Sequence, residues 1–164
     1  MGLKESGLRG SLRNVSVGID AIPDTSVSRP DDEDVGEGET VKRGLVINSD
    51  ISWPSIDAKL SANVSGLTKA YIYESEGGNL IGDKDISDLS SGDVFRFDDV
   101  DLDPDTDYNL VGDAEGSEYT RGDLRDADFP FESEDGDLRI VDGGINEDDT
   151  ISTASNFVEI GNLS

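Results

Sequence analysis

The sequence contains no cysteine and no histidine, and these two absences exclude most metal and covalent chemistry. Without cysteine there is no disulfide, no thiolate metal ligand and no cysteine nucleophile. Without histidine the chain lacks the usual general base, the serine–histidine–aspartate triad and the commonest protein ligand of zinc, copper and non-haem iron. The composition therefore predicts a protein that is not an enzyme, has no cofactor and acts by binding or assembly.

The chain also has few apolar residues and no long apolar run. Hydrophobic residues make up 34% and aromatic residues 6% of its 164 positions, which suits one domain with a small core plus an extension. The start, MGLKESGLRGSLRN, lacks the apolar segment of a signal peptide, and no stretch approaches the roughly 20 apolar residues of a membrane span. We therefore expect a protein that is made and kept soluble, unless a separate machinery exports it, and that has no membrane partner.

Basic residues are scarce, with 13 lysines and arginines against 38 acidic residues and a formal net charge of −25. Repulsion between carboxylates reaches about 10 Å at 0.1 M salt but only about 3 Å at 1 M salt. The excess of short, strongly hydrated aspartates therefore indicates a surface adapted to high salt. It also excludes nucleic acid and anionic membranes as partners, since both are recognised through lysine and arginine.

The charge is unevenly distributed and divides the chain into three parts. Residues 1–29 carry four basic and three acidic residues, and are predicted to form an N-terminal anchoring arm. Residues 30–42 are predicted to be an extended acidic linker, and residues 43–164 a β-sandwich domain. The linker prediction rests on six acids within nine positions: Asp31, Asp32, Glu33, Asp34, Glu37 and Glu39.

The arm has the pattern of a strand that needs a partner. Val15, Val17 and Ile19 alternate with small or polar residues, which is typical of a strand with one apolar face. We expect this strand to add to an exposed sheet edge, with Arg9 and Arg13 against carboxylates of a neighbour. The alternative is that it forms the first strand of the protein's own sheet.

The strongest structural signal is an unbroken alternation of apolar and polar residues over positions 55–65. It predicts one strand with an apolar face on the core and a polar face in solvent. Three residues are predicted to be buried together: Ile56, Leu60 and Val64. Three others are predicted to face solvent or a neighbour: Asp57, Lys59 and Asn63.

Further short strands are predicted along the rest of the chain, separated by glycine-containing turns. No window has the 3.6-residue period of a helix. The sequence thus predicts an all-β, antiparallel β-sandwich of immunoglobulin-like or jelly-roll type with an extended N-terminal arm. The predicted strands lie at residues 70–73, 94–97, 108–111, 138–141 and 157–160.

The densest acidic run, residues 98–107, is a candidate cation site. Alternating aspartates resemble the start of a calcium loop, because Ca²⁺ binds six to eight oxygen ligands. From Asp101, however, Thr106 stands where a calcium loop requires glycine and Gly112 where it requires glutamate. We therefore expect a hydrated loop and no metal site, with a structural Ca²⁺ or Mg²⁺ as the alternative.

Three aromatic residues form the candidate ligand site. Tyr71 and Tyr73 lie two positions apart and so share one face of a strand, and Trp53 is nearby in sequence. Such a surface is able to stack on sugar rings, as carbohydrate-binding modules do. The alternative is that these residues belong to the core and its rim.

One set of segments in the body is made mainly of strand and turn residues: residues 62–73, 79–82, 89–95, 107–111, 116–122 and 128–131. Together these segments resemble β-sandwich modules in virion proteins of haloarchaeal tailed viruses. The start of the chain, at residues 8–13 and 21–24, resembles the anchoring ends of such proteins. The resemblance covers most of the chain, and it transfers no catalytic role to any position.

The resemblance implies a capsid-vertex, capsid-decoration or tail-appendage protein, assembled with other virion proteins in the cytoplasm of a halophilic archaeal host. It also implies a symmetric homo-oligomer within the particle. The alternative from another class is a carbohydrate-binding or host-attachment module that recognises a host surface glycan. A third hypothesis is an intracellular scaffold in a salt-loving archaeon.

Overall fold

The computed structural model describes residues 22–30, 34–40, 42–75, 78–123, 128–145 and 154–163, and over these residues it contains strands and no helix. The six-stranded sheet has the order β10 (Phe131–Glu132), β11 (Leu138–Ile145), β3 (Arg43–Ser49), β8 (Tyr108–Asp113), β5 (Lys69–Glu74), β6 (Leu80–Asp85). The four-stranded sheet has the order β1 (Ser26–Ser28), β13 (Phe157–Gly161), β4 (Ile56–Leu60), β7 (Val94–Phe97). A small third sheet has the order β12 (Ala154–Ser155), β9 (Tyr119–Asp123), β2 (Asp34–Glu39).

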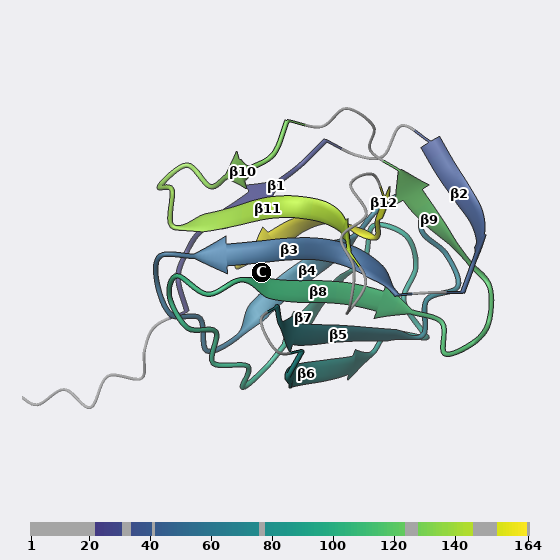
Figure 1. Cartoon of the computed structure of the whole chain (residues 1–164), viewed down its shortest axis with the longest axis horizontal. Coiled ribbons are helices and arrows are strands. Elements are labelled where there is room, and N and C mark those ends of the chain that lie inside the picture. The colour runs from purple at the N-terminus through teal and green to yellow at the C-terminus, as the bar shows by residue number, and fades with distance from the viewer. Residues whose placement is uncertain are drawn as a thin grey trace, which may run out of the picture.

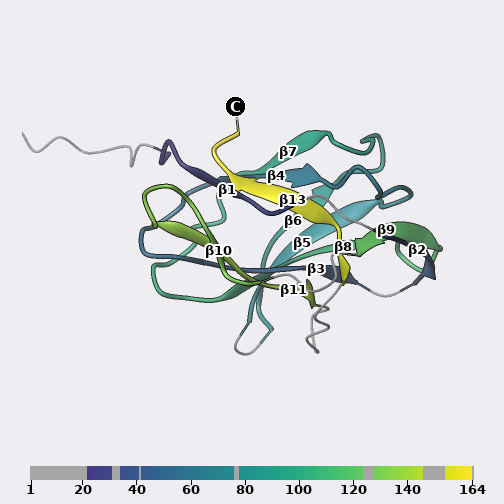
Figure 2. The same cartoon turned by 90° about the horizontal axis from the view of Figure 1, so that it is seen from above.

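Every strand pair is antiparallel, and the two larger sheets pack face to face (Figures 1 and 2). Figure 2 shows β4, β7 and β13 in one layer and β3 and β11 in the other. The all-β, antiparallel sandwich predicted from the sequence is therefore confirmed. The shorter strands predicted between residues 70 and 160 lie within β5, β7, β8, β11 and β13.

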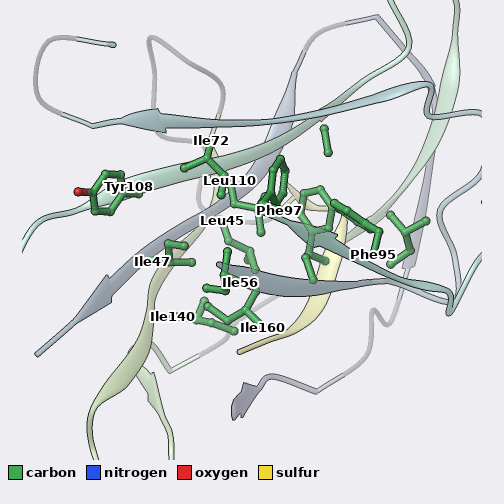
Figure 3. Packing of buried hydrophobic residues seen from close by; sticks show 14 of the residues in the cluster. Leu45, Ile47, Ile56, Ile72, Phe95, Phe97, Tyr108, Leu110, Ile140 and Ile160 are labelled. Atoms are coloured by element: carbon green, nitrogen blue, oxygen red, sulfur yellow. The ribbon is translucent and has the colours of Figure 1, made fainter. Parts of the chain in front are cut away.

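The core lies between the two larger sheets, and alternating residues of each strand supply it (Figure 3). The six-stranded sheet contributes Leu45, Ile47, Ile72, Tyr108, Leu110 and Ile140. The four-stranded sheet contributes Ile56, Phe95, Phe97 and Ile160. Phe95 and Phe97 pack edge to face, with ring centroids 5.4 Å apart, so the few aromatic residues are concentrated where they exclude most water.

The strand predicted over residues 55–65 is shorter than the alternation suggests, because β4 ends at Leu60. Leu60 and Val64 are buried as predicted, but the chain turns between them. The prediction that Asp57 faces solvent is wrong, since only 2% of this residue is exposed. Its side chain does leave the core face, but Arg96 and the main chain of Leu163 cover it.

The predicted domain boundaries are also corrected. Ser26–Ser28, assigned to the arm, forms β1 and pairs with β13 of the same chain. Asp34–Glu39, assigned to the linker, forms β2 and pairs with β9. The acidic run forms a strand because main-chain hydrogen bonds do not depend on side-chain polarity, and an edge strand tolerates charged residues. Both segments therefore belong to the sheets of the body, and the predicted arm residues Arg9, Arg13, Val15, Val17 and Ile19 lie outside the described residues.

The aspartate-rich loop between β7 and β8 follows the same alternation as the strands. Val100 and Leu102 are buried, whereas Asp99, Asp101 and Asp103 around them are exposed. Leu102 exchanges main-chain hydrogen bonds with Trp53, at 2.8 and 3.0 Å, which holds the loop over one end of the core. Within the described ranges, no group of three or more acidic residues is arranged to hold a metal ion.

Candidate binding surface on the six-stranded sheet

The outer face of the six-stranded sheet carries a second, smaller apolar cluster. The strand residues that point away from the core include Val46 on β3, Val111 on β8 and Tyr71 and Tyr73 on β5. The register places Tyr71 beside Val111 and Tyr73 beside Asn109. We call the cluster of Val46, Tyr71, Tyr73, Val111 and Val141 the tyrosine face. Val46 and Val111 are buried, so the half-buried Tyr71, Tyr73 and Val141 form the accessible part of this cluster.

The two tyrosines lie side by side and share one cation. Their ring centroids are 5.9 Å apart, with an angle of 36° between the ring planes. The Lys42 Nζ lies 4.8 Å from the centroid of Tyr71 and 5.1 Å from that of Tyr73, within cation–π distance of both. The same Nζ donates a hydrogen bond of 2.9 Å to the Tyr73 hydroxyl. Lys42 thus links the segment before β3 to the aromatic pair on β5.

The electrostatic surroundings keep the Tyr71 hydroxyl protonated. Burial raises the pKa of Tyr71 above its usual value, and the carboxylates of Glu115 and Asp113 raise it further, against a smaller opposite effect of Lys42. A protonated phenol both donates and accepts hydrogen bonds. Together with the π-face of its ring, this suits a ligand with hydroxyl groups and apolar C–H surfaces.

A polar network occupies the same sheet face nearer the ends of β3 and β11. Arg139 donates to Asp50 Oδ2 at 2.6 Å and to Asn48 Oδ1 at 3.1 Å, and it forms an ion pair with Glu132 at 3.4 Å. Asn48 in turn donates to Asp107 Oδ1 at 2.8 Å. The hydrogen bond from Arg139 lowers the pKa of Asp50, which is therefore ionised at neutral pH. These groups form hydrogen bonds and ion pairs with one another, so they hold the ends of β3 and β11 together rather than offer a reactive residue.

A hollow of about 530 Å³ opens at the end of β5, one residue beyond Tyr73. Its lining is almost entirely polar and anionic, which suits hydrated or hydroxyl-rich ligands better than apolar ones. The residues that line it are Glu74, Ser75, Asp105, Thr106 and Asp107.

Trp53 does not belong to this surface, so the predicted three-residue aromatic site is corrected. Trp53 is fully buried in the core, and its indole N–H donates to the Ser49 hydroxyl at 2.9 Å. The tyrosines stay on the outer face because β5 presents Ala70 and Ile72 to the core. The sandwich thus separates Trp53 from Tyr71 and Tyr73 by the thickness of a sheet.

Sequence reasoning missed Lys42. Its only sequence signal is that it is a cation at the end of an acidic run, and nothing local connects it with tyrosines about thirty positions later.

The described part of the chain also contains no helix of the length and apolarity needed to cross a membrane. Comparison with protein-family models, with curated proteins and with solved structures gives no match. What the surface binds is therefore inferred from its own residues.

Proposed function

We propose that the protein is a non-enzymatic structural component of a halophilic virus particle, anchored by its N-terminal segment and displaying the acidic β-sandwich. The observation that carries this proposal is the contrast between the two parts of the chain. The whole chain has a net charge of −25, whereas the 21 residues before the first described position contain Lys4, Arg9 and Arg13 against Glu5 and Asp20. A segment with this charge is attracted to carboxylates on neighbouring subunits.

The acidic body supports a role in concentrated salt. The exposed aspartates of the loop after β7 have no basic residue within the loop, so they depend on water and salt for screening. The one strongly buried carboxylate in the four-stranded sheet, Asp57, is paired with Arg96. Internal charge is therefore neutralised and external charge is left to the solvent, as expected for a halophilic surface protein.

The anchoring role is tested by reversing charges in the full chain. Arg9→Glu combined with Arg13→Glu is expected to lower incorporation into particles about tenfold or more, because attraction to a carboxylate becomes repulsion. Lys69→Glu combined with Lys84→Glu is the matched control, since it makes the same charge change in the body. Incorporation is measured by mass spectrometry of purified particles. Equal incorporation of the two double variants would contradict the proposal.

A second candidate function, carbohydrate binding for host attachment, is favoured by the pair of tyrosines beside a polar hollow. Aromatic rings stack on the apolar face of a sugar while nearby polar groups bind its hydroxyls. In this protein Tyr71 and Tyr73 would supply the rings. Because Lys42 lies over both rings, a neutral sugar that stacks on them must displace its ammonium group.

This second candidate is tested with glycans released from host surface-layer glycoprotein. Tyr71→Ala and Tyr73→Ala are expected to abolish binding, whereas Val94→Ala, an exposed hydrophobic residue on β7 of the four-stranded sheet, serves as the control. Lys42→Ala is expected to strengthen binding of a neutral glycan, because the rings become accessible. Weaker binding by Lys42→Ala would instead indicate an anionic sugar. Binding that survives both tyrosine substitutions would exclude this surface.

A further inference from the structure

The two sides of the sandwich are closed differently. At one side the edge strand β1 packs against β10 and β11, and Thr25 beside it donates a hydrogen bond to Asp135 at 3.0 Å. At the other side β6 ends the six-stranded sheet and β7 ends the four-stranded sheet (Figure 1). These two strands meet at Gly82, where an added Cβ would lie 3.6 Å from Phe97 Cδ1 of β7 and 2.9 Å from Val100 Cγ1 of the loop that follows. The β6–β7 side is therefore tightly packed inside but has two strand edges with no further strand beside them in the described structure.

The main chain of β7 presents hydrogen-bonding groups away from the sheet. Leu60 N–H donates to Asp93 C=O at 3.0 Å and Leu60 C=O accepts from Gly92 N–H at 3.2 Å, so a bulge at Gly92 and Asp93 precedes the ladder between β4 and β7. Along an antiparallel ladder, residues whose main chain bonds to the neighbouring strand alternate with residues whose main chain does not. Counted from Asp93, Phe95 and Phe97 bond to β4, whereas the N–H of Val94 is directed away from β4. Val94 is also 44% exposed, one of two large hydrophobic residues so exposed in the described chain.

We propose that this β7 edge receives residues 15–21 of a neighbouring copy of the chain as an added strand. The proposal rests on the anchoring role given above and names both the partner and the receiving surface. Main-chain hydrogen bonds to β7 would supply affinity, and the alternating Val15, Val17 and Ile19 would supply an apolar face next to Val94. A short edge strand with an exposed aliphatic residue is a suitable acceptor, since its one charged residue, Arg96, is held on the sheet face by its ion pair with Asp57.

The distribution of charged residues favours the β7 edge over the β6 edge as the acceptor of the added strand. The outer edge strand β6 carries Asp83, Lys84 and Asp85, a charged sequence of the kind that blocks pairing. The segments flanking β7 instead place exposed Asp93 and Asp98 at its two ends. These carboxylates are positioned for the basic residues that precede the apolar positions of the incoming segment.

Chain length and topology support a neighbouring copy as the source. β1 and β7 lie at opposite ends of the same sheet, three strand spacings or about 14 Å apart. A strand added beyond β7 lies four strand spacings, or about 19 Å, from β1 of the same chain. The link from Ala21 to Ser26 spans only about 16 Å when extended, at about 3.3 Å per residue, which is too short to carry residues 15–21 to that position on their own molecule. A contact that joins the β1 side of one copy to the β7 side of the next is head-to-tail, and such a contact generates a ring when its rotation closes.

The first test blocks the edge without removing a bond to β4. Val94→Pro deletes only the outward N–H, and proline is tolerated at such edge positions. In molar salt it is expected to weaken self-association of the full chain about tenfold, whereas Val94→Thr keeps the N–H and stays near the wild type. Association is measured by sedimentation velocity, and folding by fluorescence of the single tryptophan, Trp53. Folded Val94→Pro that associates like the wild type would overturn the proposal, as would a wild type that stays monomeric.

The second test does not depend on the proline variant folding, and it uses the absence of cysteine. Full-chain Ser16→Cys is mixed with full-chain Asp98→Cys and treated with a short bismaleimide crosslinker. A crosslinked heterodimer is expected, in about tenfold excess over the product with Glu134→Cys, an exposed residue near β1. In the double variant Ser16→Cys with Asp98→Cys, a crosslink within one monomer at high dilution would show that the segment binds its own β7, which overturns the neighbouring-copy proposal.

The two proposals fail in different ways. In one outcome, charge reversal at Arg9 and Arg13 abolishes incorporation into particles, but Val94→Pro associates like the wild type. This outcome would support the anchoring role and reject the β7 edge as the surface that receives the segment. Normal incorporation of the charge-reversed variant, together with crosslinking between copies, would reject the particle anchor but keep the contact between copies.

Discussion

The carboxylate of Asp57 is buried in the four-stranded sheet. Replacing Asp57 by asparagine tests how the buried negative charge is stabilised. Its Oδ1 accepts a hydrogen bond of 2.6 Å from Arg96 Nε, and its Oδ2 accepts bonds of 2.8 Å from Arg96 and 2.9 Å from the Leu163 N–H. Asp57 therefore joins β4 to β7 and fastens the end of the chain to the four-stranded sheet.

The expected cost of Asp57→Asn follows from these contacts. The amide keeps the shape of the carboxyl group but loses its charge, and hydrogen bonds to charged groups contribute about 1.5–3 kcal/mol each. Because about a third of the Arg96 side chain is open to water, it regains part of that energy by hydration. We expect a net loss of about 2–3 kcal/mol, a substantial fraction of the 5–15 kcal/mol typical of a domain.

The assay is urea denaturation in molar salt, since guanidinium is itself a salt. Fluorescence of Trp53, the single tryptophan and a fully buried one, reports unfolding of the core. Glu159→Gln is the matched control on the same sheet face, because its pair with Lys59 is 3.8 Å long and well exposed. That control is expected to change stability by less than about 1 kcal/mol. Equal destabilisation by both substitutions would refute the role given to Asp57.

The pH dependence gives an independent check with a definite sign. Burial raises the pKa of Asp57, but hydrogen bonds from Arg96 and from the Leu163 N–H, with the charge of Arg96, outweigh it and hold the pKa below its usual value. A carboxyl group with a lowered folded-state pKa contributes stability above the unfolded value, near 3.9, and loses it as pH falls through the folded value. The wild type should therefore lose more stability than Asp57→Asn below about pH 4. Asp50, Asp85 and Asp135, whose pKa values are also lowered, titrate in both proteins and cancel in the comparison.

Two further predictions concern the core and the charge. Leu60→Asp should prevent folding, because Leu60 is 2% exposed and the new charge has no partner, whereas Lys59→Asp, on the outer face, should leave a folded protein by circular dichroism. Equal tolerance of the two would contradict the position of β4. Transfer from molar salt to a few tenths molar should unfold the domain, since screening then weakens while the net charge stays at −25. An unchanged strand signal in salt-free buffer would remove the basis for salt adaptation.

Local alternation was sufficient to predict β4, β5, β7, β8, β11 and β13 and most of the core, but it did not predict β6, β9 or β10. Residues such as Ile72, Phe95 and Leu110 occupy period-2 positions, and burial of one face of a strand is a property that the sequence carries locally. The turns at Gly92, Gly116 and Gly136 were likewise predictable, because each has the positive φ that glycine adopts without strain. The all-β class therefore followed from the residues alone.

The pairing of distant segments was decided only by the tertiary structure. The acidic segment Asp34–Glu39 forms a strand because β9, more than eighty residues later, offers main-chain partners that no local pattern announces. Trp53 entered the core, and Lys42 reached Tyr71 and Tyr73, because the sheets brought together residues far apart in sequence. Periodicity determines which face of a strand is apolar, but which strand or side chain lies against that face depends on contacts between remote parts of the chain.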